Sequence, residues 1–132
     1  MKVLLDTNAY SALRRGHDFV AGQVRRSEEV LVSSIVIGEL LFGFRNGSRY
    51  DENAQALRTF LEDPHVRLLT VTWETADLFG RISAELRKKG RPIPTNDIWI
   101  AAHALEAGAD LLSSDSHFGQ IDDLPWVAFP AI

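Results

Sequence analysis

Four acidic residues stand at positions where a role in folding alone explains a charged side chain poorly. Each one ends an apolar run, begins a helix-like segment or interrupts an apolar one: Asp6, Glu39, Asp97 and Asp115. Carboxylates that are brought together repel one another unless a cation or shared protons neutralise their charge. Because a hard divalent cation such as Mg²⁺ prefers oxygen ligands, we expect the four carboxylates to form one metal site.

A metal site of this kind could hydrolyse a phosphodiester with water. The reaction needs a nucleophile in line with the departing oxygen and relief of the charge that grows on the phosphate, and bound metal can supply both. We assign Asp6, Glu39 and Asp97 to an ion that activates water. A second ion, about 3.5–4 Å away, would stabilise the departing 3′ oxygen, and Asp115 would hold that ion or orient the water. The sequence leaves open whether one or two ions bind.

Each acid also has a purely structural explanation. Acids are common in the first turn of a helix, which is enough to account for Asp97, and Asp115 could cap a turn. Glu39 could pair with Arg45, because an acid among apolar residues is costly without a strong partner. Asp6 is the hardest to explain in this way, since the end of an apolar strand is a recurrent place for a ligand group.

Strand-like and helix-like segments alternate along the chain, which is the pattern of a parallel sheet covered by helices. The expected strands cover residues 3–5, 30–32, 67–71 and 110–113, and a short edge strand over 126–129 would be the fifth. The expected helices cover residues 7–15, 19–27, 35–45, 51–62, 73–89 and 95–107. The pattern therefore predicts one α/β domain over residues 1–132, with a short, mostly parallel sheet of four or five strands flanked by helices.

This topology predicts where the acids meet. In an open α/β sheet, ligands bind outside the carboxyl ends of the strands, so Asp6 and Asp115 should share one rim. Asp97 should join them from the first turn of its helix, where the helix dipole favours an ionised carboxylate. Glu39, one turn into its own helix, should point toward the same crevice.

The composition excludes several classes of protein. A chain of 132 residues with 45% hydrophobic and 24% charged residues suits one globular domain with a single core. It contains no cysteine, which excludes disulfides and thiolate metal sites. No apolar run approaches the length needed to cross a bilayer, and the segment Met1–Asp6 lacks the apolar core of a secretion signal. We therefore expect a cytoplasmic protein with no membrane partner.

The net charge of −4 does not exclude a nucleic-acid partner. Lys and Arg number 14 and Asp and Glu number 18, so setting aside the four expected ligands leaves 14 of each sign. Four basic residues are candidates to contact RNA phosphates, because each neutralised phosphate adds salt-dependent affinity: Arg14, Arg15, Arg87 and Lys88. Arg87 and Lys88 could equally be a solvated helix end that the dipole favours.

Several of these segments together resemble the motifs of PIN-domain ribonucleases. They are Asp6-Thr7-Asn8 after the first strand, Ser34 with Glu39, Asp97 within Pro94-Thr95-Asn96-Asp97, and Ser113-Ser114-Asp115-Ser116-His117-Phe118. Their order, their spacing and the total length most resemble the VapC-type toxins of bacterial and archaeal toxin–antitoxin pairs. The similarity covers nearly the whole chain.

The resemblance implies an Mg²⁺- or Mn²⁺-dependent endoribonuclease that cuts structured RNA. It also implies a protein that is often a homodimer and is held inactive by an antitoxin peptide lying over its site. By position, the four acids match the acidic quartet of the family, and Asp115 matches its most variable member. Asn8 and Ser113 match nearby polar positions that support ligands or water, and threonine is also common in the family at the position of Ser113.

Other classes of function can also place an acid after the first strand or use a metal site. Phosphoryl transfer of the aspartyl-phosphate type also places an Asp after the first strand, but it usually needs a second acid two residues later, where this chain has Asn8. A receiver-like signalling domain would need an acidic pair after the first strand and a lysine after a late strand, and the sequence shows neither. A metal-dependent phosphatase and a catalytically inactive PIN-like binding module remain open, because a metal site can also serve structure alone.

The histidines give weaker evidence for a metal site than the acids do. His117 follows Asp115 by two residues, but one histidine in a turn is more often structural than a ligand. His103 lies within an alanine-rich helix and is expected to be packed or surface-facing.

Overall fold

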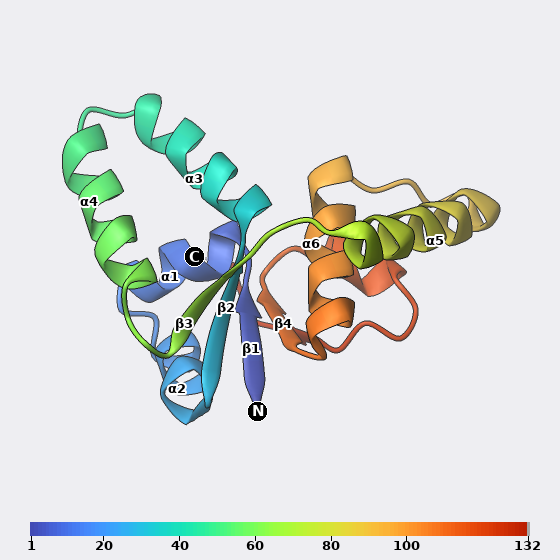
Figure 1. Cartoon of the computed structure of the whole chain (residues 1–132), viewed down its shortest axis with the longest axis horizontal. Coiled ribbons are helices and arrows are strands. Elements are labelled where there is room, and N and C mark those ends of the chain that lie inside the picture. Colours follow the sequence, from blue (N-terminus) through green and yellow to red (C-terminus); the bar gives the residue numbers. More distant parts are fainter. Residues whose placement is uncertain (132) are drawn as a thin grey trace.

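The fold centres on a five-stranded sheet, seen in a computed structural model that describes residues 1–131 (Figure 1). The strands are β1 (Lys2–Leu5), β2 (Glu29–Ser33), β3 (Val66–Leu69), β4 (Asp110–Ser113) and β5 (Trp126–Ala128). Their order across the sheet is β3-β2-β1-β4-β5, and every neighbouring pair is parallel. The predicted parallel α/β sheet is therefore confirmed, including the edge strand β5.

Six helices and one 3-10 turn connect the strands. They are α1 (Thr7–Arg14), α2 (Asp18–Arg26), α3 (Ser34–Arg45), α4 (Tyr50–Leu61), α5 (Trp73–Lys89), α6 (Thr95–Ala107) and η1 (Ser116–Gln120). Local sequence explains where the longest of them begin and end. Thr72 and Thr75 form a capping box at the start of α5. Gly90 and Gly108 end α5 and α6 at positive φ angles of 66° and 64°, which glycine adopts without steric cost.

Alternation along the strands sends side chains to two sides of the sheet. Leu4 pairs with Leu31 and Leu111 in register, and all three are buried in the larger core together with residues of α5 and α6. Val3 and Leu5 instead belong to a smaller core that includes residues of α1 and α2. Because β1 is buried on both faces, its short apolar run is explained.

The largest difference from the expected strand bounds is at the end of β3. β3 ends at Leu69, two residues before the predicted end at residue 71. The carbonyl of Thr70 accepts a hydrogen bond from Nε2 of His103 at 3.1 Å, and Thr72 already serves as the N-cap of α5. The chain therefore leaves the sheet early because its backbone groups bond to α6 and begin α5.

The order of the strands positions one edge of the sheet for chemistry. The chain passes from β1 to β2 and β3 on one side and later crosses to β4 and β5 on the other, so the connections leave β1 and β4 in opposite directions. Such a switch point, at the carboxyl ends of the strands, is where open α/β sheets bind ligands. Figure 1 shows α3 and α4 as a helical hairpin extending beyond this edge. Within residues 1–131, no helix has the length and hydropathy to span a bilayer.

Candidate metal centre

Asp6 occupies the switch point directly. It follows β1 and caps α1, so its Oδ1 accepts a hydrogen bond from the backbone N–H of Ala9 at 2.8 Å. Its Oδ2 accepts a hydrogen bond from the hydroxyl of Ser113, at the end of the neighbouring strand β4. Burial raises the pKa of Asp6 to about 6, although these two hydrogen bonds oppose the shift. The expected support from Ser113 is therefore a direct contact to the carboxylate.

Asp97 lies in the first turn of α6 and faces the other acids. Its Oδ2 is buried and has no hydrogen-bond partner among the described residues. The pKa of Asp97 is raised to about 7, first by burial, then by a hydrogen bond and negative charge from Asp115, and further by the charges of Glu39 and Asp6. Because all three other acids act on this carboxyl, the quartet shares one electrostatic environment.

Asp115 and His117 form the third part of the site. Oδ1 of Asp115 accepts the backbone N–H of His117 at 2.9 Å, so the acid does cap the turn η1. The imidazole Nδ1 of His117 lies 2.8 Å from the same oxygen and 3.5 Å from Oδ2 of Asp97. One ligand atom from each of these three residues lies within 4.8 Å of the other two. Asp115 can therefore cap the turn η1 and still lie close to Asp97 in the site.

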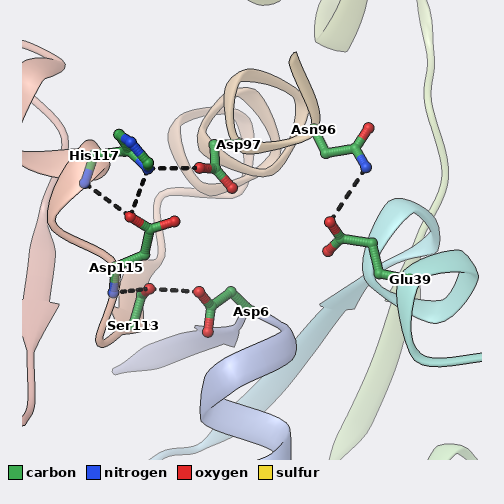
Figure 2. Close-up of polar contacts among 7 residues, drawn as sticks. All are labelled: Asp6, Glu39, Asn96, Asp97, Ser113, Asp115 and His117. Carbon is green, nitrogen blue, oxygen red and sulfur yellow. Dashed lines mark hydrogen bonds and ion pairs between the residues drawn. The ribbon is translucent and has the colours of Figure 1, made fainter. Parts of the chain in front are cut away.

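Glu39 enters the same space from α3, opposite His117 in Figure 2. Its two oxygens accept hydrogen bonds from Oγ1 of Thr7 at 2.6 Å and from Nδ2 of Asn96 at 3.2 Å. Arg45 lies instead over the ring of Tyr50, 4.1 Å from its centroid. Thr7 and Asn96 therefore position Glu39, and the ion pair with Arg45 that the sequence suggested does not form among the described residues.

The donor set of this centre fits a divalent cation. Four carboxylates surround one space in Figure 2, and two of them have pKa values that burial raises. The buried Oδ2 of Asp97 lacks a hydrogen bond within the described chain, which is the condition a cation would relieve. Oxygen donors of this kind suit Mg²⁺ and Mn²⁺.

Comparison with known proteins identifies the family. A model of the PIN domain matches residues 3–124. This chain belongs to the PIN-domain family. The resemblance seen in the motifs is therefore confirmed, and it extends over nearly the whole chain.

Among the curated relatives of this PIN domain are two ribonucleases of Haemophilus influenzae. Ribonuclease VapC1 of strain R2866 is 30% identical over 131 residues, which cover 96% of each chain. Ribonuclease VapC2 of strain ATCC 51907 / DSM 11121 / KW20 / Rd is 34% identical over 117 residues, which cover 87% of each chain.

Solved structures show the same fold. VapBC-1 from nontypeable Haemophilus influenzae superposes with a TM-score of 0.85 at 29% identity, covering 97% of this chain and 98% of that chain. VapBC2 from Rickettsia felis, bound to a DNA fragment from its promoter, gives a TM-score of 0.84 at 25% identity, covering 98% of this chain and 99% of that chain.

Three polar residues of the PIN domain that contact the acids were not predicted in that role. Thr7 and Asn96 each stand beside an acid in the first turn of a helix and bond to Glu39. Asn8, expected to support a ligand, is exposed, and its neighbour Thr7 makes the contact. His117 was expected to be structural, yet its imidazole lies against two of the acids. Their positions in the sequence give a signal for these contacts. Thr7, Asn96 and His117 each lie within two residues of an acid of the quartet.

The remaining candidates lie away from the carboxylates. Arg14 and Arg15 are exposed at the end of α1 and line a hollow of about 240 Å³ between α1, α3 and α4. Arg87 and Lys88 are exposed in the last turn of α5. His103 is buried, as the prediction of a packed side chain allowed, and its Nδ1 lies 2.9 Å from the hydroxyl of Ser33.

Proposed function

We propose that this PIN domain is a divalent-metal-dependent endoribonuclease and the toxin of a toxin–antitoxin pair, acting on structured RNA. The observation that carries the proposal is the convergence of the carboxylates at the switch point of the sheet, with the Oδ2 of Asp97 buried and without a hydrogen bond in the described structure. Curated relatives that carry the name ribonuclease support the reaction class.

Asp6, Glu39, Asp97 and Asp115 would hold Mg²⁺ or Mn²⁺ in this proposal. When bound, the cation supplies a nucleophile from water near neutral pH and offsets the charge that develops on the phosphate. Asp6, Glu39 and Asp97 are assigned to one ion. Asp115 is assigned to a second ion or to the orientation of the attacking water.

The protein fixes two of these carboxylates before any cation binds. Ser113 and the backbone of Ala9 bond to Asp6, while Thr7 and Asn96 bond to Glu39. Holding ligands in place in this way removes part of the entropic cost of assembling a site around an ion.

Burial and the nearby Asp115 are the leading causes that raise the pKa of Asp97 to about 7 in the metal-free protein. A cation that binds Asp97 would displace the proton this carboxyl holds, so metal binding should release protons near neutral pH.

The partners follow from the same comparison. The likeness to VapBC-1 and VapBC2 supports an antitoxin partner. A homodimer is proposed from the sequence resemblance to VapC-type toxins alone. For the RNA itself, the exposed basic side chains at the ends of α1 and α5 are the proposed phosphate contacts, Arg14 and Arg15 on one helix and Arg87 and Lys88 on the other.

The test is cleavage of mixed RNA by the purified protein with and without Mg²⁺, beside Asp6→Asn and Asp97→Asn. The expected result is metal-dependent cleavage by the wild-type protein that both substitutions abolish. Asp77→Asn is the matched control, because Asp77 is exposed on α5 and shows no ion pair in the described structure. Cleavage that persists in both site variants would reject the nuclease and favour a contaminant or another site.

A further inference from the structure

His117 brings the one nitrogen donor to an oxygen-rich part of the described site. Its Nδ1 lies 2.8 Å from Oδ1 of Asp115 and 3.5 Å from Oδ2 of Asp97, as Figure 2 shows. The latter oxygen is the buried atom that has no hydrogen-bond partner among the described residues. The imidazole itself is half exposed, with 50% of its side chain accessible, so an ion can reach this face from solvent.

The separations match those of ligands that share one cation. Two ligand atoms on neighbouring octahedral positions, each about 2.1 Å from the ion, are about 3 Å apart. The two measured distances from Nδ1 lie on either side of that value. One atom from each of the three side chains also lies within 4.8 Å of the other two. The three side chains are therefore close to the arrangement of ligands around one ion.

The chain holds the imidazole in this direction. The carboxylate of Asp115 accepts the backbone N–H of His117 at 2.9 Å, and the N–H of Asp115 donates to the hydroxyl of Ser113 at 2.9 Å. The turn thus ties the histidine backbone to the acid it faces and ties that acid to the end of β4. The side chain is presented by a short, bonded turn and not by a free loop.

We propose that His117 is a nitrogen ligand, with Asp97 and Asp115, of a first-row transition-metal ion such as Mn²⁺, and that it makes this part of the site select such an ion over Mg²⁺. This inference rests on the metal centre of the proposed function and adds to it a ligand and an ion preference. Imidazole nitrogen is a common ligand of transition metals, whereas Mg²⁺ takes oxygen ligands and keeps much of its water. Replacing one oxygen donor by nitrogen therefore favours Mn²⁺.

A simpler role for His117 would have a different consequence. If the histidine were only a positive neighbour of two acids, its removal would strengthen the binding of both cations by the same factor, because Coulomb attraction does not distinguish ions of equal charge. A ligand that discriminates between ions must change the two affinities unequally. The ratio of the Mn²⁺ and Mg²⁺ affinities is therefore the decisive quantity.

The experiment uses the whole chain and needs no RNA. Mn²⁺ binding to the wild-type protein and to His117→Asn is measured by electron paramagnetic resonance of the free ion, and Mg²⁺ binding is measured by competition. Asparagine keeps a short polar side chain but presents an amide in place of the imidazole nitrogen. The expected result is a Kd for Mn²⁺ that rises about tenfold or more, on the scale of ligand-supporting residues, with a change of less than about twofold for Mg²⁺.

The matched control is His65→Asn, which alters an exposed histidine whose partner is Asp63. It should leave both affinities unchanged. Pulsed electron paramagnetic resonance of bound Mn²⁺ gives a second readout, in which coupling to a ligand nitrogen should be present in the wild type and in His65→Asn but absent in His117→Asn. The coupling in the wild-type protein does not depend on the stability of any variant.

Equal changes in the two affinities, an unchanged Kd for Mn²⁺, or the absence of nitrogen coupling in the wild type would each overturn the inference. The ribonuclease proposal is judged separately by RNA cleavage in Mg²⁺ and by its loss in Asp97→Asn. A nuclease that works with Mg²⁺ and shows no nitrogen ligand would keep the proposed function and lose only this extension.

Discussion

Ser113, the last residue of β4, donates its hydroxyl hydrogen bond to Asp6, which directly follows β1. The same hydroxyl oxygen accepts the backbone N–H of Asp115 at 2.9 Å. One small buried side chain thus connects the first and fourth acids of the quartet across two neighbouring strands. Parallel pairing of β1 with β4 makes this possible, because it brings the two carboxyl ends to the same edge of the sheet.

Ser113→Ala should lower the stability of the protein and raise the pKa of Asp6. The substitution removes a hydrogen bond that lowers the pKa of Asp6 and leaves a buried carboxylate less well satisfied. We expect the free energy of unfolding to fall by about 1–3 kcal/mol and the pKa of Asp6 to rise further. Urea unfolding and a carboxyl-carbon NMR titration measure the two effects. Ser113→Thr keeps the hydroxyl and is the control, and an Asp6 titration that does not move in Ser113→Ala would contradict this role.

Removing the hydroxyl of Thr7 should weaken the metal site without touching a proposed ligand. Thr7 donates to Glu39 at 2.6 Å, so Thr7→Val frees that carboxylate to rotate at nearly constant side-chain volume. Groups that orient a ligand in this way commonly contribute about 10–100-fold to metal affinity. We expect the Kd for Mn²⁺ to rise by about tenfold, measured by titration calorimetry. Thr7→Ser should retain the wild-type affinity; if Thr7→Val does so too, Glu39 does not depend on this bond.

The positions of the acids could be predicted from the sequence because they follow from the backbone. A short apolar run that ends at Asp6, and another that leads to Asp115, are recognisable as buried parallel strands. Once both strands are assigned to one sheet, their carboxyl ends must share an edge. Gly90 and Gly108 likewise mark the ends of α5 and α6 through local backbone preference.

Side-chain direction could not be predicted in the same way. Successive residues of a helix point roughly 100° apart, so whether Thr7 or its neighbour Asn8 faces Glu39 depends on the angle at which α1 leaves β1. That angle is set by packing across the whole domain. The fold of η1, which turns His117 back onto Asp115, depends on a hydrogen bond formed only in the folded turn. Asn96 stands beside Asp97, but it contacts Glu39, which lies 57 positions away, and no local pattern predicts which acid it reaches.

Arg14 and Arg15 should contribute to RNA binding through phosphate contacts. The loss of one phosphate contact reduces the slope of log affinity against log salt by about 0.7–0.9, between the values for single strands and for a duplex. We therefore expect Arg14→Ala, made in the cleavage-deficient Asp97→Asn background, to lower RNA affinity and flatten the salt dependence by about that amount. Filter binding at several salt concentrations measures both. Arg58→Ala, at an exposed position on α4, is the control; an equal effect there would show that only net charge matters.

The two raised pKa values predict how the stability of the metal-free protein depends on pH. The pKa of Asp6 is raised from 3.8 to about 6 and that of Asp97 to about 7, so the folded state holds these protons at pH values where the unfolded state has released them. Their contribution to stability is fully present below about pH 4 and is lost as the pH rises through 6 and 7. A divalent cation should restore stability above that range by replacing the protons.

Asp97→Asn isolates the larger of these two contributions. Asparagine resembles the protonated carboxyl, so in the presence of a chelator the variant should be more stable than the wild type above the folded pKa of about 7 and similar to it near pH 4. Urea unfolding at both pH values, with and without Mn²⁺, measures the crossover. Saturating Mn²⁺ should reverse the order at high pH, because the wild type gains binding energy that the amide cannot match. The prediction would be contradicted by a variant that is less stable than the wild type by the same amount at both pH values. Such a result would show that the Asp97 carboxylate is ionised at both pH values and has favourable partners in the folded protein, so that burial does not destabilise its charged form.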